Sequence, residues 1–166
     1  MNSNLFPGEQ ELSSAKILII DDEDVYIHTL EWALRQAKFS NFRSLTDSTK
    51  AREEFERFQP DLVLLDLNMP GLDGFAVLQQ FRESAAAGDF LPVLILTSDS
   101  TGDTRRRAMA AGATDFLGKP VDYTELILRI KNLLQTRFLY RQVQTLQTQI
   151  ETLTATKGAK DQTQPD

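Results

Sequence analysis

The sequence contains no cysteine, which excludes disulfides, thiolate catalysis and cysteine-based metal sites. No apolar run approaches the roughly 20 residues needed to cross a bilayer. The first sixteen residues have neither the basic segment nor the apolar segment of a secretory signal. We therefore expect a cytoplasmic protein with no membrane partner.

Basic residues are in the minority, since 18 Lys and Arg stand against 24 Asp and Glu and give a net charge of -6. The one basic run, at residues 105–107, is typical of a solvated helix face. Binding to a phosphate backbone needs a concentrated basic surface. We therefore expect no direct contact with nucleic acid.

Short apolar runs alternate with amphipathic stretches along most of the chain. Continuous apolar runs such as ILII and LVLL are typical of central parallel strands that helices cover on both faces. The pattern predicts an α/β fold with a doubly wound, five-stranded parallel sheet. The predicted strands are residues 17–20, 42–45, 62–65, 93–96 and 115–117, and the predicted helices between them contain residues 25–37, 51–58, 75–81 and 108–111.

Polar residues stand at the carboxyl ends of the predicted strands: Asp21 and Asp22, Asp66, Thr97, and Lys119. In an open doubly wound sheet, ligands bind in the crevice beyond these ends. Unit charges about 4 Å apart repel by about 4 kcal/mol at an effective dielectric constant of about 20, so clustered carboxylates imply a cation. Carboxylate oxygens suit Mg²⁺, and an aspartate can become an aspartyl phosphate. Together, the acids, the hydroxyl and the ammonium at these strand ends predict a phosphoryl-transfer site.

The segments ILIIDDED, LVLLDLNMPGLDGF, VLILTS and GATDFLGKP, in this order and spacing, resemble the receiver domain of two-component response regulators, in the CheY-like superfamily. The resemblance covers about residues 15–135 and implies a flavodoxin-like sheet with strand order 2-1-3-4-5. It implies that Asp66 is the phosphoacceptor, which takes a phosphoryl group from a histidine of a kinase or of a phosphotransfer protein. It also implies that Asp21, Asp22 and Asp66 hold Mg²⁺, with the backbone carbonyl of Asn68 as a further ligand.

The same resemblance assigns roles to residues near the ends of the last two strands. Thr97 and Lys119 would bind the phosphoryl oxygens, and the bond between Lys119 and Pro120 would be cis. Phe116 occupies the aromatic switch position, which is often Tyr in the family. Phe lacks the hydroxyl group, so an inward state of this residue would rely on packing alone.

Simpler interpretations stand beside some of these roles. Asp24 is typical of a helix N-cap, and an aromatic near a sheet edge, such as Phe116, is commonly a core residue. His28, the single histidine, lies on the first predicted helix, which leads away from the crevice. We therefore expect the chain to receive a phosphoryl group rather than to donate one.

The last part of the sequence predicts one long helix from Tyr123 onward, with a first half that packs on the sheet. In its second half, apolar residues follow the 4, 3, 4, 3 spacing of a coiled coil, namely Leu139, Val143, Leu146, Ile150 and Leu153. A homodimer through this helix is one prediction, and a fraying amphipathic tail is the other. The predicted organisation is an N-terminal extension at 1–14, a receiver at 15–135, a helical extension at 136–156 and a disordered tail at 157–166.

The main hypothesis is a single-domain signalling receiver that catalyses only its own phosphorylation and dephosphorylation and docks to a downstream protein partner. The alternative is the receiver and linker of a multidomain regulator whose output domain is a cyclic-dinucleotide enzyme. A third hypothesis, that the chain is a Mg²⁺-dependent phosphohydrolase with Asp66 as nucleophile, is less favoured. Such enzymes usually have a second acid two residues after the nucleophile, where this chain has Asn68.

Overall fold

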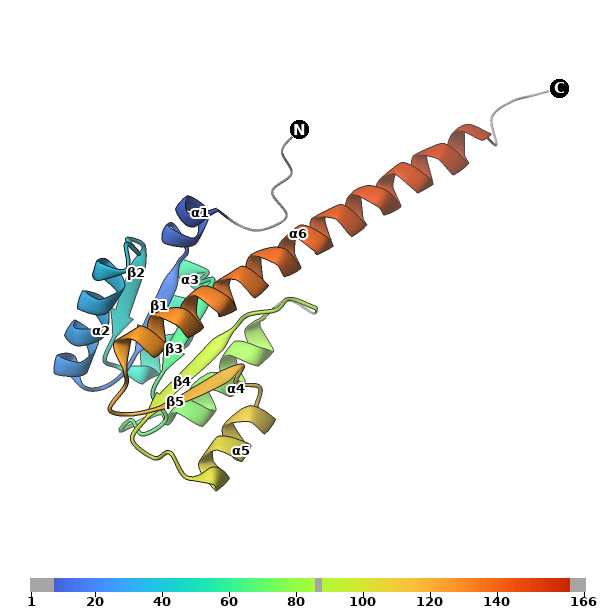
Figure 1. The fold of residues 1–166 in the computed structure, drawn as a ribbon. Coiled ribbons are helices and arrows are strands. Elements are labelled where there is room, and N and C mark those ends of the chain that lie inside the picture. Colours follow the sequence, from blue (N-terminus) through green and yellow to red (C-terminus); the bar gives the residue numbers. More distant parts are fainter. Residues whose placement is uncertain (1–7, 86–87, 162–166) are drawn as a thin grey trace.

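A five-stranded parallel sheet of order β2-β1-β3-β4-β5 forms the centre of the computed structural model (Figure 1). The structure describes residues 8–85 and 88–161, with side chains up to residue 155. The predicted sheet, its parallel pairing and its strand order are confirmed. The strands are β1 (Ile17–Ile20), β2 (Phe42–Leu45), β3 (Leu62–Leu65), β4 (Val93–Thr97) and β5 (Asp115–Gly118).

Helices cover both faces of this sheet. Three of them, α3, α4 and α5, pack on one face, and α2 and α6 pack on the other together with the short α1 (Figure 1). A 3-10 turn, η1 (Ser48–Lys50), precedes α3. The helices are α1 (Glu9–Ser13), α2 (Asp24–Gln36), α3 (Ala51–Phe58), α4 (Gly74–Ser84), α5 (Gly102–Ala110) and α6 (Tyr123–Asp161).

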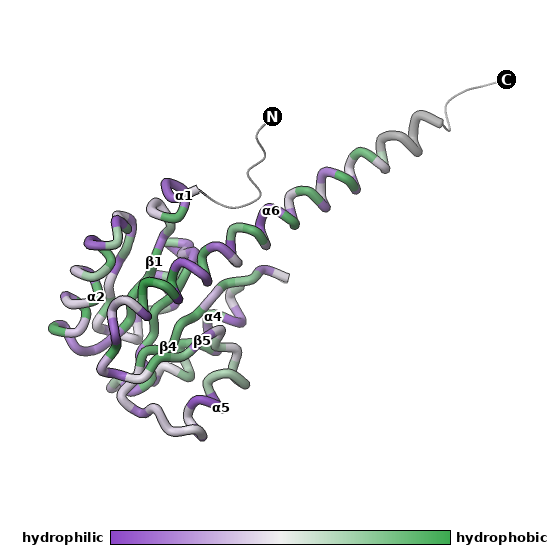
Figure 2. Tube along the Cα trace, in the orientation of Figure 1, coloured by the Kyte–Doolittle hydropathy of each residue, from purple (hydrophilic) through white to green (hydrophobic). Residues whose placement is uncertain are grey.

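The burial of the strands follows their composition. Every residue of β1, β3 and β4 is buried, whereas β2 at the sheet edge is only partly buried. Alternate side chains of the central strands therefore enter two separate apolar clusters, one under each helical layer. Figure 2 shows mainly hydrophobic positions along the central strands and a mixture of hydrophobic and hydrophilic positions along the surrounding helices.

The long helix α6 has two different parts. Near its start, Leu126, Ile130 and Leu134 are fully buried against the sheet. Farther along, the helix leaves the body of the protein and continues to Asp161 (Figure 1). The predicted tail at 157–166 is thus helical up to that residue, and residues 162–166 lie outside the described part of the chain.

The segment predicted only as an N-terminal extension contains α1. Its one buried residue, Leu12, joins the cluster beneath α2 and α6. The backbone N–H of Ser40 also donates to the carbonyl of Ser13, which ties α1 to the end of the α2 region. Across the described ranges, the chain has no helix of the length and apolarity that a bilayer span requires.

Candidate functional site

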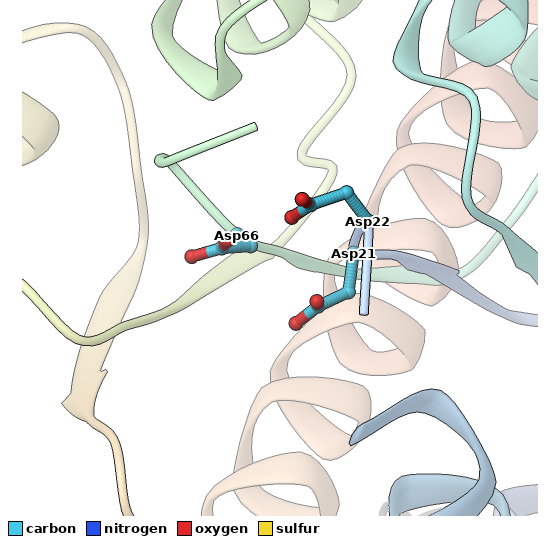
Figure 3. Close-up of side chains that lie close together, drawn as sticks. All are labelled: Asp21, Asp22 and Asp66. Atoms are coloured by element: carbon cyan, nitrogen blue, oxygen red, sulfur yellow. The ribbon is translucent and has the colours of Figure 1, made fainter. Parts of the chain in front are cut away.

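Parallel register brings the three predicted acids together. Ile20 at the end of β1 pairs with Leu65 at the end of β3, and the N–H of Asp66 donates to the carbonyl of Ile20 over 2.9 Å. The next residues of both strands therefore share one edge of the sheet. One carboxylate oxygen from each of Asp21, Asp22 and Asp66 lies within 4.8 Å of the others. Figure 3 shows the side chains of Asp21 and Asp22 extending toward the side of Asp66.

Asp21 is held in place by two hydrogen bonds. Its side chain accepts from the backbone N–H of Glu23 at 3.0 Å and from the Lys119 ammonium at 2.6 Å. The prediction that Asp24 caps the following helix is wrong. The N-cap of α2 is Glu23, which makes no side-chain capping bond, and Asp24 is the first helical residue. The Asp21 carboxylate accepts from the N–H of Glu23 instead, so one acid both orders the loop and faces the site.

Lys119 supplies the positive charge of the site. It follows β5, where its backbone N–H donates to the carbonyl of Thr97 at 2.8 Å. Its ammonium lies 2.6 Å from Asp21, 3.6 Å from Glu23 and 3.7 Å from Asp66, and the side chain is only 9% exposed. The cis bond to Pro120 that the resemblance implied is confirmed.

Asp66 has a buried carboxylate. One of its oxygens accepts a backbone hydrogen bond, and the other faces the ammonium of Lys119. Its Oδ1 accepts from the N–H of Leu67 at 2.9 Å, and its Oδ2 faces Lys119. Burial raises the pKa of Asp66 above its ordinary value, and the charge of Lys119 opposes this shift. Burial also raises the pKa of Asp21, although the hydrogen bond from Lys119 opposes it. Because one ammonium faces three carboxylates, the site has a deficit of positive charge that a divalent cation would relieve.

Thr97 completes the side of the site formed by β4. The residue is fully buried, and its hydroxyl accepts from the side-chain amide of Asn68 at 3.1 Å and from the N–H of Asp99 at 3.4 Å. This hydroxyl therefore links the loop after β3 to the loop after β4. Asn68 itself is exposed and lies two residues after Asp66 in the sequence.

Phe116 lies apart from the acids. It pairs with Ile95 in the sheet and is buried in the apolar cluster beneath α3, α4 and α5. The Arg105 guanidinium lies 6.0 Å from the centre of its ring. Packing surrounds the aromatic side chain, as expected for a Phe that has no hydroxyl group to anchor.

Two further residues of the site were missed in the sequence. The ring of Tyr26, on the first turn of α2, lies with its centre 4.1 Å from the ammonium of Lys119. Gly74 begins α4 against the loop that carries the phosphoacceptor candidate. A Cβ at position 74 would lie 2.2 Å from the carbonyl oxygen of Asp66 and 2.6 Å from the Cα of Leu67. The sequence alone gives no signal of this close backbone contact.

Comparison with known proteins places the chain in a family. A sequence model of the response regulator receiver domain matches residues 17–131, so the chain belongs to the response regulator receiver family. It is 36% identical over 126 residues to the transcriptional regulatory protein PrrA of Mycobacterium leprae, covering 76% of this chain and 52% of PrrA. It is 37% identical over 125 residues to the response regulator PleD of Caulobacter vibrioides, covering 75% of this chain and 27% of PleD. The chain thus matches about half of one relative and about a quarter of the other.

Solved structures agree with this assignment. A putative response regulator from Chloroflexus aurantiacus superposes with a TM-score of 0.67 at 31% identity, over 73% of this chain and 98% of that one. The receiver domain of the sensor histidine kinase PA1611 from Pseudomonas aeruginosa superposes with a TM-score of 0.66 at 26% identity, with the same coverage. That structure has a magnesium ion coordinated in its active-site cleft.

Proposed function

We propose that this protein is a phosphoacceptor receiver in which Asp66 takes a phosphoryl group from a phosphohistidine of a kinase or of a phosphotransfer protein in the cytoplasm. The observation that carries the proposal is the buried Asp66 carboxylate, which lies beside two further acids and one ammonium at the sheet edge. In the transfer, a carboxylate oxygen of Asp66 forms a bond to phosphorus while the phosphorus–nitrogen bond breaks. The imidazole leaves with the electron pair and takes up a proton from solvent.

The donor set fits Mg²⁺, a hard cation that prefers oxygen ligands and retains several waters. Asp21, Asp22 and Asp66 would hold it, with the backbone carbonyl of Asn68 as a further ligand. When bound, the ion would neutralise negative charge on the phosphoryl oxygens. Support comes from the three clustered carboxylates and from the magnesium ion in the related PA1611 receiver.

Lys119 and Thr97 would bind the phosphoryl oxygens and convert phosphorylation into a change of shape. A phosphoryl group on Asp66 offers new acceptors to both side chains, which would draw the loop after β4 inward. The surface formed by α5, β5 and α6 would change with it, and Phe116 would follow. Shifting such an equilibrium from 1:99 to 99:1 takes about 5.5 kcal/mol, which several charge-assisted contacts can supply.

Intact mass spectrometry tests the phosphoacceptor role. The purified protein is incubated with acetyl phosphate or phosphoramidate, with and without Mg²⁺, beside the variant Asp66→Ala. We expect the mass of one phosphoryl group to appear only when both Mg²⁺ and Asp66 are present. No adduct on a folded, Mg²⁺-binding protein would refute the proposal and leave a constitutive docking module.

The switch has its own test. Lys119→Ala should leave phosphorylation of Asp66 detectable but should abolish the effect of phosphate on hydrogen exchange in the loop after β4 and in α5. If this variant changes its exchange on phosphorylation as the unaltered chain does, Lys119 does not couple the site to the surface.

Two exposed apolar side chains on α2 support a protein as phosphoryl donor. Val25 is 81% exposed and Trp32 is 54% exposed on α2, and the Trp32 ring contacts the ring of Tyr123 at the start of α6. Exposed apolar groups of this size favour a protein contact. We expect Val25→Asp to keep its reaction with phosphoramidate and to lose at least tenfold in rate with any phosphohistidine protein that phosphorylates the unaltered chain. Equal losses with both donors would argue against a docking role.

A second candidate function places the chain in a longer regulator with a cyclic-dinucleotide enzyme as output. The observation that favours a longer regulator is that the matched part makes up only 52% of PrrA and 27% of PleD, and the type of output domain is the part that the experiment decides. Sequencing the gene past the codon for residue 166 tests this candidate. An open reading frame that continues into a cyclic-dinucleotide enzyme domain would support it, and a stop codon or a different output domain would exclude it.

A further inference from the structure

The outer part of α6 presents a row of large apolar side chains to solvent. Val143 and Leu146 are about half exposed, Ile150 is 61% exposed and Leu153 is 70% exposed. Figure 2 shows hydrophobic and hydrophilic positions alternating along this part of the helix, beyond the body of the protein. Within the described part of the chain, no other element covers this row. A row of this kind is characteristic of a helix that pairs with another helix.

The residue types at these positions specify the kind of pair. Counted as a heptad, the row places Leu139, Leu146 and Leu153 at d positions and the β-branched residues Val143 and Ile150 at a positions. β-branched residues at a with Leu at d favour two parallel helices over larger assemblies. A parallel pair of identical helices in register sets each of these residues against its own copy.

The flanking positions permit identical helices to approach. The e and g positions beside the row carry no charge; they are Tyr140, Gln142, Gln147, Gln149 and Thr154. Two copies therefore do not repel one another there, and no ion pairs select a different partner. In a parallel pair, Gln142 of one helix lies near Gln147 of the other, and their amide groups can exchange hydrogen bonds.

Threonine hydroxyls on the opposite face of the helix already have hydrogen-bond partners. The hydroxyls of Thr145, Thr148 and Thr152 donate to the backbone carbonyls one turn earlier in the same helix. Arg137 and Arg141, at b and f positions, contact the receiver. The receiver therefore holds the helix by side chains outside the a and d positions, Tyr140 at an e position included, and leaves the row accessible from Val143 onward.

A polar clamp fixes the base of the exposed segment. The Arg137 side chain is 3% exposed and binds the Asp89 carboxylate with two nitrogens, one of them at 2.9 Å. Tyr140 donates to the carbonyl of Gly88, and Arg141 binds Asp61. These contacts fix the helix for about two turns beyond its last buried leucine, so the first part of the row is already positioned before pairing.

We infer that α6 pairs with a second copy of this chain as a parallel, in-register, two-stranded coiled coil through residues 139–153. The row covers only about two heptads, so the pair forms reversibly and depends on protein concentration. The inference is independent of the proposed phosphoacceptor role, because none of its residues belongs to the Asp66 site.

Sedimentation of the full chain over a range of concentrations tests the pairing. We expect a reversible equilibrium between monomer and dimer. Leu146→Lys places a charge in the row and should weaken the dimer by about tenfold or more. Thr148→Lys adds the same charge on the outer face and should leave the equilibrium unchanged. A monomer at every concentration, or equal behaviour of the two variants, would overturn the inference.

Cross-linking tests the orientation on a chain that has no cysteine of its own. Leu153→Cys places a thiol near one end of the row, where it meets its own copy only in a parallel pair. We expect this variant to form a disulfide-linked dimer under mild oxidation, while Thr148→Cys on the outer face does not. A dimer in sedimentation without a cross-link in the Leu153→Cys variant would overturn the parallel register. Equal cross-linking of both variants would also overturn it, because random collision would then account for the disulfides.

Discussion

The ammonium of Lys119 lies 4.1 Å from the centre of the Tyr26 ring and 2.6 Å from the carboxylate of Asp21. A π face from α2 and an acid from the end of β1 thus position the same cation from two sides. Cation–π contacts contribute about 0.5–2 kcal/mol, the larger values when the pair is desolvated. Tyr26 is therefore a positioning residue for the ammonium that would bind the phosphoryl group.

Replacing Tyr26 by Leu should slow phosphorylation by phosphoramidate by about 2- to 30-fold, which corresponds to the loss of this contact. Tyr26→Phe keeps the ring and should keep the rate. In the part of the chain that the structure describes, the Tyr26 hydroxyl is buried without a hydrogen-bond partner, so its removal should not destabilise the fold. The rate of mass gain measures both variants. A Leu variant as fast as the unaltered chain would show that the ring does not position Lys119.

Lys119 also acts as the counterion of the acids. Without it, three carboxylates within 4.8 Å would face one another with no ammonium beside them. We expect Lys119→Met to lower the free energy of unfolding by about 3 kcal/mol in EDTA, because the buried Asp21 loses its partner. Mg²⁺ should then stabilise this variant more than it stabilises the unaltered chain.

Thermal unfolding with and without Mg²⁺ measures this difference. Lys131→Met removes a lysine from the exposed side of α6 and serves as the matched control. Its response to Mg²⁺ should equal that of the unaltered chain. If Mg²⁺ raises the melting temperature of the Lys119 variant no further than that of the control, the acids do not share one cation.

The sequence was most informative where one physical rule determined the structure. Continuous apolar runs predicted β1 and β3, and parallel pairing then required Asp21 and Asp66 to meet at one sheet edge. The site was therefore predictable from the strand ends. The contact between Tyr26 and Lys119 was not, because it joins the first turn of α2 to the residue after β5, and no periodicity links these positions.

Local patterns failed where tertiary contacts compete with them. Aspartate is a common N-cap residue, which is why Asp24 was predicted to cap α2. In the structure Asp24 is the first residue of the helix, and the carboxylate of Asp21 accepts a hydrogen bond from the N–H of Glu23. Val25 was assigned to the apolar pattern of this helix, yet it is 81% exposed. Helix α1 was missed because its five residues include a single buried side chain, Leu12, which is too few to show a period.

Gly74 should tolerate no side chain. Gly74→Ala would place a methyl group 2.2 Å from the carbonyl oxygen of Asp66, so the backbone of α4 or of the phosphoacceptor loop must shift. We expect a loss of about 1–3 kcal/mol or more in the free energy of unfolding and a slower reaction with phosphoramidate. Urea unfolding checks the first effect and mass spectrometry the second.

Gly102→Ala is the control for this variant, since Gly102 also begins a helix and a Cβ there would meet only the end of the Arg106 side chain, at 3.5 Å. It should change neither quantity. If Gly74→Ala were as stable and as reactive as this control, the close approach of α4 to Asp66 would not constrain the site.

The Asp89 clamp on α6 should make stability depend on pH. A hydrogen bond from Arg137 lowers the pKa of Asp89 below its ordinary value of 3.8. The ionised carboxylate therefore stabilises the fold above that value, and this contribution disappears as the pH falls through the lowered pKa. In urea unfolding, Asp89→Asn should be less stable than the unaltered chain at pH 7 and should converge with it in acid. Asp103→Asn removes an exposed carboxylate that pairs with Arg106, and should change little at neutral pH. A gap for Asp89→Asn that stays constant into acid would contradict a role for its charge.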